Sequence, residues 1–185
     1  MRRMGNQRGF SLIEVLVTLV LVTIGVLGMV ALQGRSIQYT QDAVQRNNAV
    51  SLVNDLAEII RANPGELFAS SPTPGTPYYG AFKDSSLFYK AAGGAFEDVD
   101  DCVSVPKTAA EQLGCWVAAV ERELPGDVDL FQANTYICRS SAKGSCNAQG
   151  SMLEIQLAWR VKPGTCPGTG ISDDTVCIYR TRVEL

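Results

Sequence analysis

The sequence contains no histidine, which removes the commonest general base and the commonest metal ligand of proteins. Ser–His and Cys–His nucleophile pairs are therefore excluded, and most hydrolytic mechanisms lose their usual side chains. A basic stripe is also missing, and the formal net charge of the 185 residues is −3, so the chain has no electrostatic footprint for nucleic acid. We expect a protein that is not an enzyme, needs no cofactor and does not bind nucleic acid.

Charge is almost absent from a long apolar run near the N-terminus. From residue 10 to residue 32 the only charged side chain is that of Glu14. These 23 residues are enough to cross a bilayer as an α-helix. Arg2, Arg3 and Arg8 precede the run and would keep the N-terminus in the cytoplasm. The pattern predicts one membrane span followed by a polar domain.

Three interpretations of this N-terminal segment compete. A secretory signal peptide would have a shorter apolar region and a small-residue cleavage site, neither of which is present. A plain membrane anchor explains the length but not Glu14, because a carboxylate at the bilayer centre costs about 2.5–3.5 kcal/mol without a partner. Cleavage after Gly9 would supply that partner, since it creates an amino group on Phe10, four residues before Glu14.

The motif after the basic leader runs Gly9-Phe10-Ser11-Leu12-Ile13-Glu14 and opens the apolar run. It resembles the cleavage motif of class III prepilins, which include type IV pilins and type II secretion pseudopilins. The resemblance implies that prepilin peptidase removes residues 1–9, that Phe10 is N-methylated, and that Glu14 serves assembly. It also implies a single-pass protein of the inner membrane, with its C-terminal domain in the periplasm, that later enters an extracellular filament. Loss of the leader and its three arginines would change the net charge from −3 to −6.

The helix is expected to continue beyond residue 32. Residues 33–62 contain no proline, and Asn63-Pro64-Gly65 is a stop signal. The apolar residues of this part recur at helical spacings and predict an amphipathic continuation: Ile37, Val44, Leu52, Val53, Leu56, Ile59 and Ile60. We expect this stripe to pack on a globular extracytoplasmic domain formed by residues 63–185.

That domain is predicted to be mixed. Residues 108–124 have the pattern of a short helix, with Thr108 as its cap, Glu111 three residues later and Trp116 as a core anchor. Residues 134–139, 151–161 and 176–185 are expected to form antiparallel strands. The predicted fold class is therefore α+β and type IV pilin-like, with a long N-terminal helix packed on a small antiparallel sheet whose loops are closed by disulfides.

Six cysteines lie in the C-terminal half of the chain: Cys102, Cys115, Cys138, Cys146, Cys166 and Cys177. Their even number suits three disulfides in an oxidising compartment. Fifteen connectivities exist, of which we predict pairing in chain order. A zinc site is disfavoured because the sequence has neither a C-x-x-C motif nor a histidine.

One dense acidic cluster offers oxygen ligands for calcium, formed by Glu97, Asp98, Asp100 and Asp101. Asp173 and Asp174 form a smaller pair near the last cysteine. The spacing fits no EF-hand loop, and a run of charge is usually a solvated face. No metal site is predicted.

Three later segments, 24–29, 113–116 and 150–160, resemble minor pilins of the PilV type. This resemblance implies a subunit that joins other minor pilins and the major pilin, primes pilus assembly, lies at the filament tip, and serves adhesion and twitching motility. Two alternatives stay open. One is a type II secretion pseudopilin. The other is a receptor-binding tip adhesin that uses loops in residues 69–101 and 166–177.

Overall fold

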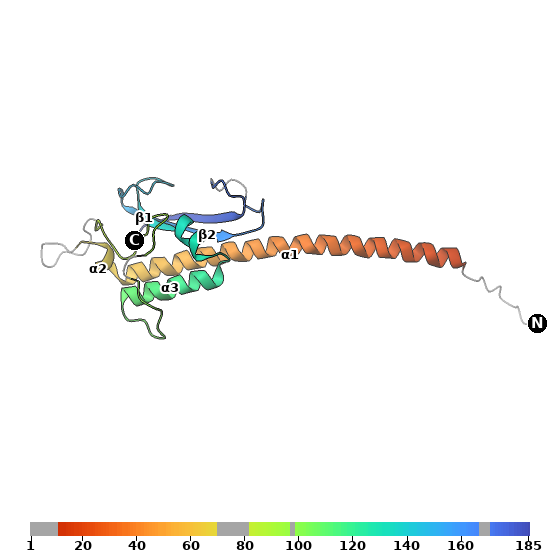
Figure 1. Cartoon of the computed structure of the whole chain (residues 1–185), viewed down its shortest axis with the longest axis horizontal. Helices are drawn as coiled ribbons and strands as arrows, with labels where there is room; N and C mark the ends of the chain where they lie inside the picture. Colours follow the sequence, from red (N-terminus) through yellow and green to blue (C-terminus); the bar gives the residue numbers. More distant parts are fainter. Residues whose placement is uncertain (1–10, 70–81, 97–98, 167–170) are drawn as a thin grey trace, which may run out of the picture. The chain divides into compact units, whose positions relative to one another are not determined.

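The computed structural model describes residues 11–69, 82–96, 99–166 and 171–185. Two compact units divide the chain, residues 1–41 and residues 42–185, and helix α1 (Leu12–Ala62) contributes to both (Figure 1). The predicted cleavage site between Gly9 and Phe10 lies outside the described residues.

The described part of the first unit consists almost entirely of α1. The helix begins where the Ser11 carbonyl accepts the N–H groups of Glu14 and Val15, at 3.0 and 3.3 Å. Its large apolar side chains between Leu12 and Leu32 are exposed, with exposed fractions between 45% and 89%. Within the described residues, α1 is one helix that is long and apolar enough to cross a membrane.

The second unit is built around the last turns of α1. Ala49, Leu52, Val53, Leu56 and Ile60 are buried in its core, together with residues of the sheet and of helix α3 (Ala109–Glu123). Helix α3 runs alongside this part of α1, and the Trp116 indole N–H donates to the Leu52 carbonyl at 2.7 Å (Figure 1). Trp116 is the predicted core anchor.

The predicted amphipathic stripe is correct only in its second half. Ile37 and Val44 remain 59% and 51% exposed, so they do not pack on the core as the pattern predicted. The reason is that Ala49 is the first side chain of α1 that the core covers completely. A helical period identifies a face but not the point along the helix at which another element begins to cover it.

Helix α3 begins as the sequence predicts. Thr108 accepts the Glu111 N–H at 3.1 Å, and a Glu111 carboxylate oxygen accepts the Thr108 N–H at 3.1 Å, which completes a capping box. Two short helices were not predicted, α2 (Pro64–Leu67) and α4 (Val128–Asn134), the latter capped by the Asp127 carboxylate.

Three antiparallel strands form the sheet in the order β1-β2-β3: β1 (Tyr136–Ser140), β2 (Met152–Arg160) and β3 (Val176–Val183). They confirm the three predicted strands, and each of the six boundaries lies within two residues of its prediction. Odd-numbered residues of β2 from Leu153 to Trp159 face the main core. The even-numbered residues Glu154, Gln156 and Ala158 are buried as well, so β2 is covered on both faces.

Candidate functional site

Glu14, the proposed assembly residue, lies in the first turn of α1 and is exposed to its surroundings. A carboxylate in this position interacts favourably with the positive end of the helix dipole. Its expected partner, the amino group of Phe10, lies outside the described residues, as does Gly9. Of the three residues assigned to processing and assembly, Gly9, Phe10 and Glu14, the structure describes Glu14.

The cysteines form three disulfides in chain order, the same pairs that the sequence analysis predicted. Cys102–Cys115 ties the loop before α3 to the helix itself. Cys138–Cys146 joins β1 to the loop that follows it, and Cys166–Cys177 joins the β2–β3 connection to β3. Each bridge closes a short segment, so the disulfides restrain loops rather than distant parts of the chain.

The acidic residues considered as calcium ligands do not gather into a site in the described part of the chain, where no group of three or more metal-ligating side chains is found. Glu97 and Asp98 lie outside that part. Asp173 accepts the N–H and hydroxyl of Thr175 and pairs with Arg160 at 3.4 Å. The hydroxyl and N–H of Thr175 hold the pKa of Asp173 below its ordinary value.

A buried carboxylate on β2 organises the loop between β1 and β2. Glu154 is completely buried and accepts the Tyr136 hydroxyl at 2.7 Å, the Ser140 hydroxyl at 3.2 Å and the Gly144 N–H at 2.7 Å. The Arg180 guanidinium lies 3.8 Å from it. Because buried charge is costly unless it is paired and hydrogen-bonded, these contacts are what allow Glu154 to remain inside.

The same contacts affect Tyr136. Burial, followed by the hydrogen bond to Glu154, raises the pKa of its phenol well above the ordinary value. Arg180 lies over the Tyr136 ring, 5.8 Å from its centroid, and its Nε donates to Gln156 at 2.7 Å. The arginine is therefore held by β2 on one side and by the tyrosine ring on the other.

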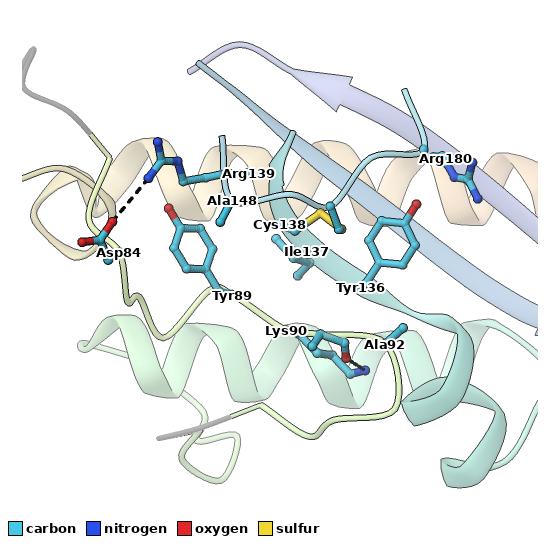
Figure 2. Close-up of a pocket in the computed structure, with 13 residues that line it drawn as sticks. Asp84, Tyr89, Lys90, Ala92, Tyr136, Ile137, Cys138, Arg139, Ala148 and Arg180 are labelled. Carbon is cyan, nitrogen blue, oxygen red and sulfur yellow. Dashed lines mark hydrogen bonds and ion pairs between the residues drawn. A yellow bond between two sulfur atoms is a disulfide. The ribbon is translucent and has the colours of Figure 1, made fainter. Parts of the chain in front are cut away.

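A pocket of about 420 Å³ lies beside this cluster (Figure 2). It is lined by four consecutive residues of β1, Tyr136–Arg139. Neighbouring residues of a strand point to opposite faces, so a pocket that touches all four must lie at the edge of the sheet. Strand β1 is an edge strand, and the opposite wall comes from the segment around Tyr89 and Lys90.

Lys90 connects this wall to β1 and α4. Its backbone forms an antiparallel bridge with Ile137, and its Nζ donates to the carbonyls of Thr135 at 2.7 Å and Gln132 at 3.0 Å. The side chain is 2% exposed, and burial lowers the pKa of its ammonium group to about 8. The ammonium group satisfies carbonyls at the C-terminal end of α4, where positive charge is favoured.

Sequence analysis missed Lys90, Glu154 and the pocket. Glu154 stands at a polar position in an alternating strand, and this pattern does not distinguish an outward polar side chain from a buried one. Lys90 lies in a segment with no periodicity. The available signal for Glu154 was its alternation with Leu153 and Ile155 next to a disulfide-closed loop.

Two family models match the first part of the chain. The model for the prokaryotic N-terminal methylation motif matches residues 4–30, so this part of the chain is similar to class III prepilins. The model for the type IV pilin Tt1218 matches residues 31–71 and, together with the α+β fold, supports a type IV pilin. No curated protein and no solved structure gave a match.

Proposed function

We propose that this protein is a minor pilin of the PilV type, which joins other minor pilins to start assembly of a type IV pilus and lies at the filament tip. The observation that carries the proposal is the combination of a methylation-motif match with an apolar helix that leaves its side chains exposed. Such a surface has to be covered by lipid or by other apolar helices.

The position of Glu14 supports the assembly step. In the membrane, and later in a bundle of apolar helices, its carboxylate is stable only beside a positive group. Cleavage after Gly9 would provide the Phe10 amino group of the same or a neighbouring subunit. The pairing would thus select neighbours at a fixed register and make assembly depend on prior cleavage.

The test is complementation of a deletion strain with Glu14→Gln, compared with the wild-type chain and with Glu66→Gln as a control outside the apolar run. We expect Glu14→Gln to reach normal membrane levels but to restore less than about a tenth of the surface pili. Surface pili at the wild-type level in the Glu14→Gln strain would contradict the assembly role.

The same strains separate the pilus from the secretion pseudopilus. Loss of twitching motility with normal protein secretion in the deletion strain is the expected result. Loss of secretion with normal pili would instead assign the chain to a type II secretion system.

A further inference from the structure

The pocket at the edge of β1 is positively charged within an acidic protein. Its lining residues include three cationic side chains, Lys90, Arg139 and Arg180, against one carboxylate, Asp84. Asp84 is fully exposed, so water weakens its interaction with Arg139, whose Nη1 lies 3.7 Å away. Glu154, 3.8 Å from Arg180, adds a second carboxylate beside the pocket, so three cations stand against two anions there. The remaining positive charge favours an anion although the whole chain has a net charge of −3.

Arg139 is the cation that is least used by the protein. Lys90 donates to backbone carbonyls, and Arg180 is held by Gln156 and Glu154. In contrast, the ion pair of Arg139 among the described residues is the long contact with the fully exposed Asp84. Its guanidinium lies over the Phe82 ring, 5.5 Å from the centroid.

The floor between the two arginines is apolar. Figure 2 shows Tyr89 and Tyr136 with their rings on either side of the Cys138–Cys146 disulfide, and Ile137 and Ala92 nearby. A volume of about 420 Å³ is within the range of ordinary small-molecule sites. An apolar floor with an arginine at each end, Arg139 and Arg180, suits a compact ring rather than a long flexible chain.

The rim of the pocket is fixed before any ligand binds. Gly144 is held by the Glu154 carboxylate, and Cys146 by its disulfide. Ala148, also on the rim, has a left-handed backbone with φ of 56°, a conformation that is unfavourable for a residue with a Cβ. Such a residue persists only where its surroundings hold it, and a preformed rim lowers the entropic cost of binding.

We propose that this pocket binds a small ring-shaped organic acid, whose carboxylate pairs with the Arg139 guanidinium and whose ring lies over the apolar floor between Tyr89 and Tyr136. A carboxylate matches the two parallel N–H groups of a guanidinium. A single negative charge is expected because the other two cations already have partners. A sugar acid and an aromatic acid both have this chemistry, and the experiment distinguishes them.

The test is ligand-observed saturation-transfer NMR on the full chain in detergent micelles. The probes are galacturonate and 4-hydroxybenzoate, each paired with its neutral counterpart, galactose or 4-hydroxybenzyl alcohol. We expect saturable binding of at least one acid below about 10 mM, and at least about tenfold weaker binding of its neutral counterpart. The acid that binds shows whether the pocket takes a sugar acid or an aromatic acid. Binding of neither acid, or equal binding of the neutral counterpart, overturns the proposal.

Two substitutions assign the binding to Arg139. Arg139→Gln is expected to weaken binding by at least about tenfold. Arg122→Gln, on the exposed surface of α3, is the matched control and should leave it unchanged. Asp84→Asn removes the competing carboxylate and should strengthen binding about two- to threefold. This variant still tests whether the acid binds at Arg139 if Arg139→Gln does not fold. Unchanged or weaker binding by Asp84→Asn overturns the assignment.

Discussion

At the scale of single residues, the most consequential side chain of the second unit is Glu154, because one buried carboxylate joins β1, β2 and the loop between them. Removing it would leave the Gly144 N–H and the Tyr136 hydroxyl without their acceptor, whereas the Ser140 hydroxyl would keep the Ala142 carbonyl. The free energy of unfolding depends on such groups asymmetrically, since an unmade buried hydrogen bond costs more than a made one contributes.

We therefore expect Glu154→Ala to lower the free energy of unfolding by about 3 kcal/mol or more. Glu154→Gln, which keeps one acceptor oxygen, should lose about half as much. Denaturant unfolding with the disulfides intact measures both, with Glu121→Gln on the exposed face of α3 as the control. Equal stability of Glu154→Ala and the control would show that the carboxylate does not hold the loop.

Lys90 gives the stability a characteristic dependence on pH. Its pKa is lowered from 10.5 to about 8 by burial, so between these values the unfolded chain binds more protons than the folded chain. The free energy of unfolding should therefore rise with pH from about 8. Above about 10 it should fall, because burial raises the pKa of Tyr89 to about 12 and the unfolded tyrosine ionises first.

Thermal unfolding at a series of pH values checks this profile. Lys90→Met should abolish the rise between pH 8 and 10, and Lys162→Met, an exposed lysine, should keep it. A rise that persists in Lys90→Met would have to come from another group.

At the scale of secondary-structure elements, the contact between α3 and the loop before it depends on Gly114. A Cβ added at this position would collide with the carbonyl oxygen of Asp100. The neighbouring residue, Cys115, holds the same loop through its disulfide to Cys102. The loop is thus pressed against the helix where only glycine leaves room.

Gly114→Ala is expected to destabilise the second unit by about 1–3 kcal/mol despite the better helix propensity of alanine. Gly65→Ala is the matched control, because nothing lies within 4 Å of its added Cβ. It should be neutral or slightly stabilising. A chemical denaturation curve for each variant distinguishes them, and an unaltered midpoint for Gly114→Ala would exclude the close contact.

The disulfides of the two sheet loops can be compared directly. Removing Cys138–Cys146 or Cys166–Cys177 by double substitution to serine should cost about 2–3 kcal/mol in each case, since the closed loops have similar lengths. Only the first bridge lines the pocket. Its removal should also weaken binding of the organic acid. Equal binding by the two variants would show that the Cys138–Cys146 bridge does not contribute to the ligand site.

The sequence predicts elements well where a local signal defines them. The start of α3 follows from Thr108 and Glu111, and the strand β2 from the alternation of Leu153 to Trp159. Helix α4 was missed because it has only seven residues and overlaps the start of a predicted strand. The pocket could not be predicted, since it joins β1 to a segment about 45 residues earlier that has no periodicity.

At the scale of the whole molecule, the two units have opposite relations to their surroundings. The described apolar residues of the first unit are exposed, whereas the second unit encloses its own core. The first unit therefore needs lipid or other apolar helices, and the second needs an oxidising compartment for its three disulfides. Both requirements would be met by the proposed pilin if it is held in the inner membrane before assembly.

The proposed cleavage after Gly9 is the step on which this account depends, because it would create the partner of Glu14. The most direct measurement is the N-terminal sequence and intact mass of the chain isolated from its native membrane, in the wild type and in a strain without prepilin peptidase. We expect a chain that begins with methylated Phe10 only when the peptidase is present. An uncut chain in the wild type would contradict the pilin pathway and leave a membrane-anchored domain with a ligand pocket.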